Sequence, residues 1–527
     1  MAKNTLKKYL AGGLVMAMTV SSLTGCMATD TDPNEVAKAD IKIGNYKNDL
    51  MLHDPQLFLA EDGSEYYMYG SHTTGAKGSD LALQDWEQMY KEPCRPSTKM
   101  FTGLFDGLKG ATMPEAFKFT GRNESNQFSV WAPSVIYNRK MSKYLMYFCT
   151  SATYIKSSLC LASSDDPAGP WKFEKVLLSS GFTYQTVEDS NFPEIMGSKK
   201  AVKDYLLAGQ YNNQLWPNCI DPQTFYDKDG KMWMVYGSWS GGIFLLEIDP
   251  ETGDIIHPKS DPENQVDKYF GRRLLGGGHH AMEGPFIEYC EETGYYYLFL
   301  SFGGLARDGG YQIRMLRSEN VEGPYVDALG ETPDNTDSYG AHGVKMIGNY
   351  TFPSIEMAYK APGGQSTFYG SDGKLYIVYH QRFDKTQEDH EPRVHRLFAT
   401  KDGWLTMAPF QTSGEEVIKE GGYTNKDICG TYFMLNHGLK INADVIKPKQ
   451  TKYKTDGTIS GDYTGKFEVE EGTNFITLTI KDHKYEGVIF DMVDEAGNNV
   501  RCISAVGDNN TTFWGVHYMV AEEESKK

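Results

Sequence analysis

The sequence carries little positive charge for its length. Its 527 residues include 52 Lys and Arg against 70 Asp and Glu, which gives a formal net charge of −18. This surplus of negative charge opposes binding to polyanions, and no basic cluster reverses it locally. Nucleic acid is therefore excluded as a partner, and a neutral substrate suits the surface better.

The sequence also lacks the cysteine patterns of a disulfide scaffold or a zinc site. Seven cysteines follow Cys26, widely spread and odd in number, with no C-x-x-C pair and no Cys/His cluster at zinc spacing. Most of them lie in apolar strand patterns, where a buried free thiol is the ordinary expectation.

A long hydrophobic run is absent as well, since the apolar stretch from Tyr9 to Leu23 is too short to span a bilayer comfortably. Three lysines precede it, an order typical of a cleaved signal peptide. The stretch ends in Leu23-Thr24-Gly25-Cys26, which resembles the lipobox of bacterial lipoproteins, whose cysteine becomes the lipidated first residue. We therefore expect residues 1–26 to be a lipoprotein signal peptide and Cys26 to be the lipidation site.

This leader predicts export and a lipid anchor on the bacterial cell surface or outer membrane, with the anchor as the only contact with the membrane. An ordinary signal peptide with an incidental cysteine is the alternative, and export follows from either. Residues 27–45 have a polar composition with little periodicity, which predicts a flexible tether.

Aromatic residues and glycine are abundant. Aromatic residues make up 13% of the chain, with 34 Tyr, and there are 54 Gly, a balance that favours strands joined by tight turns. The length favours two domains after the leader, one large and one small.

Two stretches far apart in the sequence repeat each other. Residues 54–71 (DPQLFLAEDGSEYYMYGS) and 221–238 (DPQTFYDKDGKMWMVYGS) match at half of their positions without a gap. Each has an Asp-Pro opening, a short apolar strand, an Asp-Gly turn and an aromatic-rich strand, which predicts a β-hairpin. Three weaker copies follow, and the five opening prolines are Pro55, Pro133, Pro222, Pro285 and Pro362.

Five such units predict a five-bladed β-propeller over residues 46–410. Radial repetition lets each blade pack against its neighbours and leaves only short, protected edges. The pattern fades after Pro409, and a new series of strands from Gly430 predicts a small C-terminal β-sandwich or barrel domain within residues 411–527. The predicted fold class is therefore all-β, and we expect a monomer.

Three of the predicted blades open with a carboxylate: Asp54, Asp221 and Glu283. Because the innermost strands of a propeller converge on its axis, we expect these three side chains to face one funnel. Other Asp-Pro pairs, such as Asp249-Pro250, are followed by ordinary turn residues and not by the repeated hairpin, so we interpret them as turns.

The segments HDPQLF, WAPSVIY, IDPQTFYDKDGKMWMVYGSWSGG and EGPFI resemble the motifs of glycoside hydrolase family 43, in family order and each at its own blade. The resemblance covers roughly Lys47 to Pro409. It implies a five-bladed propeller and an inverting mechanism, with Asp54 as general base, Glu283 as general acid and Asp221 as a third carboxylate that orients the acid and tunes its pKa. Inversion needs one ionised and one protonated carboxyl, separated by enough room for a water molecule.

The segment from Trp239 to Ile243 (WSGGI) resembles that of endo-arabinanases more than that of xylosidases. The resemblance therefore implies an enzyme that cuts internal α-1,5-L-arabinofuranosidic bonds of arabinan, a plant cell-wall polysaccharide. Sugar faces stack on aromatic rings, so the candidate substrate-binding residues are His53, Trp131, Trp216 and Trp239. Core packing is an equal alternative for each tryptophan.

His380 follows the apolar strand of the fifth unit, and in arabinan-cutting relatives a histidine at this place lies by an axial calcium. Calcium prefers oxygen ligands, so contact through waters is as plausible as direct ligation. The resemblance thus implies a structural calcium at the axis, with His380 as its metal residue, and an ordinary hydrogen-bonded histidine is the alternative.

Three other functions stay open at this point. An exo-acting α-L-arabinofuranosidase or β-xylosidase would use the same acids and would close one end of its groove, for which the insertion from His72 to Glu124 is a candidate wall. A non-catalytic surface glycan-binding lipoprotein is less consistent with three retained carboxylates. A protein-interaction scaffold is less consistent still, because it needs no axial acids.

Overall fold

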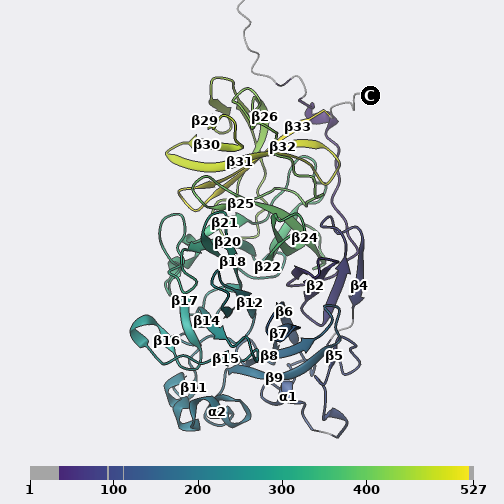
Figure 1. Cartoon of the computed structure of the whole chain (residues 1–527). Coiled ribbons are helices and arrows are strands. Elements are labelled where there is room, and N and C mark those ends of the chain that lie inside the picture. The colour runs from purple at the N-terminus through teal and green to yellow at the C-terminus, as the bar shows by residue number, and fades with distance from the viewer. Residues whose placement is uncertain (1–31, 33–34, 92–93, 111, 521–527) are drawn as a thin grey trace, which may run out of the picture.

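The computed structural model describes residues 32, 35–91, 94–110 and 112–520. Five small sheets form a propeller, and a closed eight-stranded barrel lies at one end of it (Figure 1). This confirms the predicted fold class. The predicted signal peptide and the lipidation site Cys26 lie outside the described residues. Within those residues, no helix has both the length and the apolar character needed to cross a bilayer.

Each blade is a mainly antiparallel sheet that begins with its innermost strand. The innermost strands contact one another in a closed ring, from β1 through β6, β12, β18 and β22 back to β1. Blade 1 contains β1 (Gln56–Leu59), β2 (Tyr66–Gly70), β3 (Thr74–Gly78) and β4 (Trp86–Tyr90). Blade 2 contains β6 (Val130–Asn138), β7 (Lys143–Ser151), β8 (Ser157–Ser164), β9 (Trp171–Ser180) and the parallel edge strand β5 (Phe101–Thr102).

The other three blades follow the same plan. Blade 3 contains β12 (Gln223–Tyr226), β13 (Met232–Tyr236), β14 (Ile243–Ile248) and β17 (Gly271–Leu275), with the short strands β15 (Ile255–Ile256) and β16 (Val266–Asp267). Blade 4 contains β18 (Met282–Cys290), β19 (Tyr295–Phe302), β20 (Gln312–Ser318) and β21 (Val344–Ile347). Blade 5 contains β22 (Tyr359–Tyr369), β23 (Leu375–Phe383), β24 (His390–Ala399) and β25 (Leu405–Met407).

Short helices and one small ladder fill the connections. They are η1 (Lys38–Asp40), η2 (Leu108–Gly110), α1 (Glu115–Lys118), η3 (Val187–Asp189), α2 (Phe192–Met196), η4 (Lys199–Tyr205), η5 (Pro262–Asn264), η6 (Asp337–Ala341) and the pair β10 (Leu206–Leu207) with β11 (Gln210–Tyr211).

The barrel has its own core and also packs against the propeller. Its strands are β26 (Gly430–Asn436), β27 (Lys449–Tyr453), β28 (Thr458–Gly461), β29 (Gly465–Val469), β30 (Phe475–Ile480), β31 (His483–Val493), β32 (Asn499–Gly507) and β33 (Thr512–Met519), and β33 pairs back with β26. On the propeller side, the ring of Phe490 lies 4.4 Å from that of Phe398, and Trp514 lies 5.2 Å from Tyr350. Because these residues belong to one continuous buried cluster, the barrel braces blades 4 and 5.

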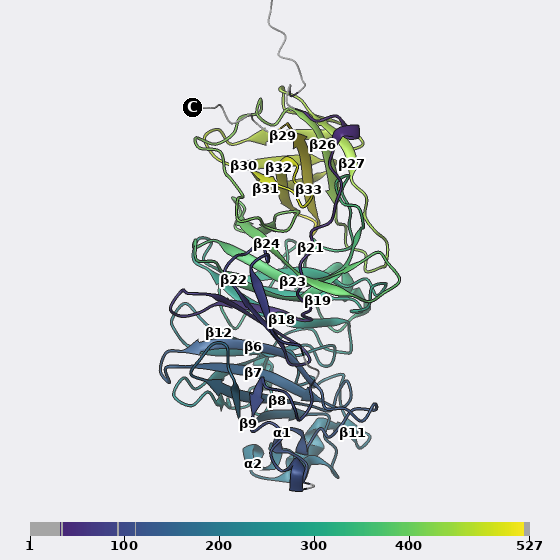
Figure 2. The same ribbon diagram turned by 90° about the vertical axis from the view of Figure 1, so that its right-hand side faces the viewer.

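The segment before blade 1 differs from the predicted flexible tether. Glu35 pairs with Met519, and Lys42 exchanges hydrogen bonds with Asn498 through its backbone amide and carbonyl. Figure 2 shows this segment running alongside the barrel toward the propeller. Described residues of the predicted tether 27–45 are therefore fixed against the barrel, because polar side chains that suggested flexibility find partners there. The prediction was wrong for this part.

The seven cysteines after Cys26 are all buried and free, as expected from the apolar patterns around them. Burial raises the pKa of the Cys94 and Cys160 thiols to about 12, so neither is a reactive thiolate at neutral pH.

Candidate active site

A cavity of about 870 Å³ opens at the centre of the propeller. It takes residues from all five blades, and the three predicted acids Asp54, Asp221 and Glu283 are among them. The expectation that these carboxyls face one funnel is therefore met by the geometry. His53, Trp131 and Trp239 line the same cavity.

The blade openings place the acids through an unusual backbone conformation. The strand registers make one residue in each opening equivalent, and all five have positive φ: Asp54 at 51°, Ala132 at 44°, Asp221 at 55°, Gly284 at 58° and Gly364 at 59°. Asp is among the few non-glycine residues that tolerate this region, although such strain is usually found at functional sites. Glu283 is one residue earlier, where blades 2 and 5 have Trp131 and Gly363.

The same registers correct the fifth opening. Ser366 pairs with Val378 as Phe286 pairs with Phe299, so Gln365 is the equivalent of the prolines in the other blades. Pro362, which the sequence predicted for this role, lies three residues earlier on β22, where the chain is irregular. Glycine is required at Gly364, because a Cβ there would lie 2.4 Å from Asp54 Oδ1.

Asp54 is held in its ionised form. Its Oδ2 accepts hydrogen bonds from His53 Nδ1 at 2.8 Å and from Ser71 Oγ at 2.6 Å. Enclosure in the cavity favours the neutral acid, but interaction with His53, together with these hydrogen bonds, outweighs it and lowers the pKa of Asp54 well below its ordinary value. An ionised carboxylate at this position can accept a proton from water.

Glu283 lies among three hydrogen-bond donors. Its Oε2 accepts from Trp239 Nε1 at 2.7 Å and Ser238 Oγ at 3.1 Å, and its Oε1 accepts from Tyr311 Oη at 2.8 Å. Burial nevertheless raises the pKa of Glu283, with the Tyr311 hydrogen bond opposing the rise and the charge of Asp54 adding to it. The balance favours a carboxyl that keeps its proton above the usual range for Glu.

Asp221 is the immediate neighbour of this acid. Its Oδ2 accepts from the backbone N–H of Gly284 at 3.1 Å, directly after Glu283 in the chain. Burial raises the pKa of Asp221 well above its ordinary value, and the charge of Glu283 adds to the rise. Two buried carboxyls that repel each other retain a proton between them while Asp54 stays ionised. One ionised and one protonated carboxyl in a single cavity is the pairing needed for acid–base hydrolysis.

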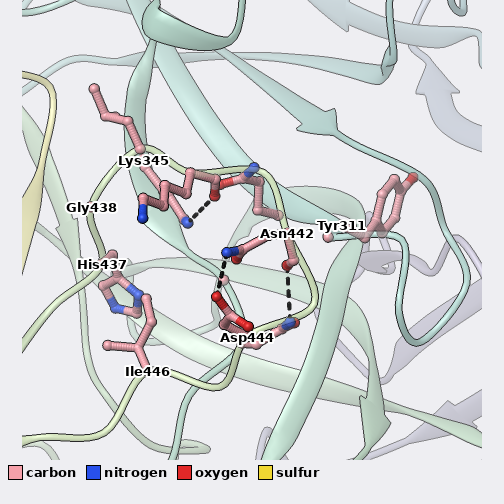
Figure 3. A pocket seen from close by; sticks show the side chains of 13 residues that line it. Tyr311, Lys345, His437, Gly438, Asn442, Asp444 and Ile446 are labelled. Carbon is pink, nitrogen blue, oxygen red and sulfur yellow. Dashed lines mark hydrogen bonds between the residues drawn. The ribbon is translucent and has the colours of Figure 1, made fainter.

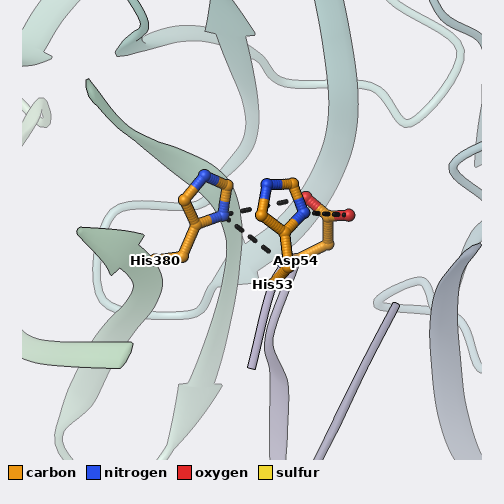
Figure 4. Close-up of side chains that lie close together, drawn as sticks. All are labelled: His53, Asp54 and His380. Atoms are coloured by element: carbon orange, nitrogen blue, oxygen red, sulfur yellow. Dashed lines mark hydrogen bonds and ion pairs between the residues drawn. The ribbon is translucent and has the colours of Figure 1, made fainter. Parts of the chain in front are cut away.

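His380 is fully buried beside Asp54 (Figure 4). Its ring stacks on that of His53 at 3.9 Å, its Nδ1 accepts a hydrogen bond from the Asp54 backbone N–H at 3.3 Å, and Nδ1 lies 3.8 Å from Asp54 Oδ1. Its Nε2 has no hydrogen-bond partner among the described residues. Burial lowers the pKa of His380 well below its ordinary value, so the ring is neutral.

The predicted aromatic subsites divide into two groups. Trp131 and Trp239 line the cavity, and Trp239 also donates to Glu283. Trp216 does not line it, because its indole packs against Tyr205 at 4.8 Å and Phe270 at 5.7 Å in the core of blade 3. The structure therefore corrects the prediction of a subsite at Trp216 to a packing role.

Several residues that contact the acids were not among the site residues predicted from the sequence. Ser71 and Ser238 each end a repeated Tyr-Gly-Ser triplet, and each donates to an acid, so the repeat itself held a signal for them. Tyr311 follows a pair of glycines outside every repeat, and no sequence pattern marks it.

The insertion from His72 to Glu124 was a candidate wall for an exo-acting enzyme. Among the described residues of that stretch, only His72 lines the cavity, and β3 and β4 of blade 1 take up part of it.

Comparisons with known proteins agree with this geometry. The family model described as glycosyl hydrolases family 43 matches residues 182–405, and a model described as a C-terminal lipocalin-like domain matches residues 409–515. The extracellular endo-α-(1→5)-L-arabinanase of Thermotoga petrophila is 34% identical, over 95% of this chain and 98% of that protein. The extracellular endo-α-(1→5)-L-arabinanase 2 of Bacillus subtilis is 33% identical, over 89% and 93%.

Solved structures show the same arrangement of domains. The crystal structure of endo-1,5-α-L-arabinanase from Thermotoga petrophila in complex with Tris has a TM-score of 0.75 and 33% identity, over 90% of this chain and 99% of that one. A family 43 protein from Bacillus licheniformis has a TM-score of 0.76 and 34% identity, over 90% and 99%. With relatives this similar over almost the whole chain, and with three carboxyl groups at the axis of a five-bladed propeller, the protein belongs to glycoside hydrolase family 43.

Proposed function

We propose that the protein is an inverting endo-α-1,5-L-arabinanase that cuts internal bonds of plant cell-wall arabinan. The observation that carries this proposal is the pairing of an ionised Asp54 with a proton-retaining Glu283–Asp221 pair in one cavity. The names of the full-length relatives support the substrate. Proton NMR during the first turnovers tests the mechanism: inversion gives the β-anomer of the new reducing end first, and the α-anomer first would contradict it.

In this mechanism Asp54 removes a proton from water while Glu283 protonates the departing sugar oxygen. The hydrogen bonds from His53 and Ser71 keep Asp54 ionised and fix its orientation. Trp239, Ser238 and Tyr311 hold the Glu283 carboxyl in place, and Asp221 anchors the backbone beside it while competing for the shared proton.

The lining of the cavity favours endo action over the exo alternative. Of the described residues in the insertion that was the candidate wall, only His72 lines the cavity. The volume of the cavity, about 870 Å³, is large enough to hold more than a single sugar ring. A non-catalytic glycan binder would not need a carboxyl held protonated beside one held ionised.

Tyr311→Phe is expected to move the alkaline limb of the kcat/KM pH profile upward by about one unit. Glu283 acts in its protonated form, so activity falls as pH rises through its pKa. Tyr311 donates to the carboxylate and lowers that pKa, so loss of the donor raises it. The matched control is Tyr325→Phe, which loses a 3.0 Å hydrogen bond to Val321 away from the cavity and should leave the limb in place. A limb that stays or moves to lower pH in Tyr311→Phe would contradict the assignment.

We also propose calcium as a structural ion at the axis, because the residues present fit it. His380 Nε2 is buried without a partner among the described residues, the ring is neutral, and one ring nitrogen of His380 lies within 4.8 Å of a ligand atom of His53 and of Asp54. Because Nδ1 accepts from the Asp54 backbone N–H, the neutral ring carries its proton on Nε2. His380 would therefore hold the ion through a water molecule to which Nε2 donates, and waters would supply the oxygen ligands that calcium prefers. Bound there, calcium would supply positive charge beside Asp54.

Chelation is therefore expected to lower arabinan hydrolysis several-fold, and added calcium should restore it. Elemental analysis should find about one calcium per chain in the wild type and none in His380→Ala. Magnesium, which demands tighter octahedral geometry, should restore less activity. Full activity in a chelated protein shown to be metal-free would rule the ion out.

Export with a lipid anchor at Cys26 remains part of the proposal, and the relatives named extracellular support the export. Cys26→Ser should move the protein from the membrane fraction to the soluble exported fraction and abolish labelling by radioactive fatty acid. Unchanged fractionation and labelling would show that Cys26 is incidental.

A further inference from the structure

A second cavity, of about 330 Å³, lies between blade 4 and the loop that joins β26 to β27 (Figure 3). Blade 4 contributes Gln312 and Lys345 to its walls, and the barrel loop contributes His437 and Asp444. Tyr311 also contributes to the wall of the active-site cavity, but none of the roles described above uses this second cavity.

Two cationic side chains are buried next to it. Lys345 is 4% exposed and Arg314 is fully buried, and the two residues pair directly across β21 and β20. Like charges directly opposite each other on neighbouring strands destabilise a sheet, and burial makes each charge costlier. Neither side chain forms an ion pair with a carboxylate in the part of the chain that the structure describes. The charge of the buried Asp327 carboxylate acts on Arg314 from further away, and no carboxylate among the described residues acts on Lys345 in the same way.

The two cations differ in how many hydrogen bonds they donate to the protein. The Arg314 guanidinium donates to the carbonyl groups of Gly340, His342 and Leu439. Lys345 Nζ has three N–H groups, and one donates to the Lys440 carbonyl at 3.1 Å. No second acceptor for Lys345 Nζ is found among the described residues, so it keeps donors for a ligand.

Other unpartnered polar groups surround the same space. Gln312 and His437 are each 1% exposed, and both polar atoms of each side chain lack hydrogen-bond partners among the described residues. A Cβ on Gly348 would lie 3.0 Å from Lys345 Nζ and 3.8 Å from Gln312 Cβ, so these side chains flank one point. Buried polar groups in folded proteins are normally paired, and a cluster without partners indicates a ligand.

The unpartnered N–H donors around this space favour a negative ligand. Burial and the charge of Arg314 lower the pKa of Lys345 to about 7, and burial lowers the pKa of His437 well below its ordinary value. A neutral His437 offers one N–H, the Gln312 amide offers two, and Lys345 offers its remaining donors. Asp444 is exposed at the mouth, where Asn442 Nδ2 donates to it at 2.6 Å, and it forms no ion pair with Lys345.

We propose that this cavity binds a small anion, inorganic or carboxylate, through Lys345 Nζ, a ring N–H of His437 and Gln312 Nε2. The anion neutralises the paired cations at the interface between the propeller and the barrel. Water fills the rest of the space, and the site ties the docking of the two domains to the anion content of the medium.

Thermal unfolding of the purified protein in chloride, sulfate or acetate tests the proposal. The wild type should show a saturable rise in Tm of about 3 °C for at least one of these sodium salts. Lys345→Met, of similar length without the charge, should lack the saturable part. Which salt saturates first distinguishes an inorganic ion from a carboxylate. Parallel, non-saturating rises in both proteins would overturn the proposal.

Gln312→Glu gives a second, independent test, because it supplies the anion covalently with almost no change in shape. This variant should unfold at a higher temperature than the wild type in low salt and should lose the salt response. A lower Tm in low salt with the wild-type salt response retained would overturn the site. Asp444→Asn should leave the site intact and should bind anions more tightly, because it removes a negative charge from the mouth. Loss of the saturable rise in Tm in this variant would overturn the proposal and would make Asp444 the counter-ion of Lys345.

Crystals of the protein soaked in bromide add a direct view. An anomalous peak beside Lys345 Nζ supports the site. A cavity that holds only water at high bromide overturns it.

Discussion

Glu283→Gln should lower kcat on linear arabinan by about 10² to 10⁴-fold. The glutamine side chain fits the same place, with its amide oxygen accepting from Trp239 and Ser238 and its NH2 group donating to Tyr311 Oη, but the amide is not acidic enough to protonate the departing oxygen. The loss should be much smaller on an aryl arabino-oligosaccharide whose phenolic leaving group needs no protonation. Rates measured on both substrates separate an acid from a residue that only shapes the cavity.

Glu288→Gln is the matched control for this result. Glu288 lies on the same strand, β18, and burial raises its pKa to about 8, but it accepts from Thr367 and does not line the cavity. Its substitution should leave kcat within a few-fold of the wild type. Equal losses in the two variants, or a loss in Glu283→Gln that is the same on both substrates, would contradict the acid role.

Asp54→Asn is expected to give the second large effect, a loss of kcat of about 10² to 10⁴-fold on both substrates. Asn tolerates the φ of 51° at this position, so the fold should survive, whereas its amide cannot take a proton from water. Because the base acts on water and not on the leaving group, an activated leaving group should not rescue this variant. The two variants thus differ in how their losses depend on the substrate.

Asp249→Asn is the corresponding control, since Asp249 also precedes a proline. There Asp249 accepts from Glu251 and Thr252 in a turn, as the sequence predicted for this pair. The control should retain wild-type kcat. A wild-type rate in Asp54→Asn, with the protein folded, would remove Asp54 from the chemistry.

The repeats made much of the fold and the acids predictable. The Asp-Pro openings and Asp-Gly turns recur because each blade needs the same bend at the axis and the same hairpin, and this periodicity is visible in the sequence. The positive φ at Asp54 and Asp221 could not be predicted from the sequence. The residue type does not reveal it, because the equivalent residue in blade 2, Ala132, has a positive φ as well. The same limit explains the fifth opening. There the sequence suggested Pro362 as the equivalent of the other opening prolines, but the strand register shows that Gln365 takes that position.

Contacts between distant segments explain the other differences between the structure and the predictions from the sequence. Tyr311 reaches Glu283 from a loop without a motif, and Trp216 packs on Phe270, which directly precedes β17 of blade 3. The polar residues before blade 1 looked like a tether because their partners, such as Asn498, lie more than 400 residues away in sequence. Local composition carries no information on such pairings.

The central claim is endo action on arabinan by Asp54 and Glu283, and the most direct measurement is the size of the products. Debranched linear arabinan is digested by the wild type, Asp54→Asn and Glu283→Gln, and the products are resolved by chain length from the first minutes. A mixture of short oligosaccharides from the wild type, with almost none from either variant, is the predicted result. Arabinose as the only early product, or no hydrolysis of arabinan by the folded wild type, would contradict the claim.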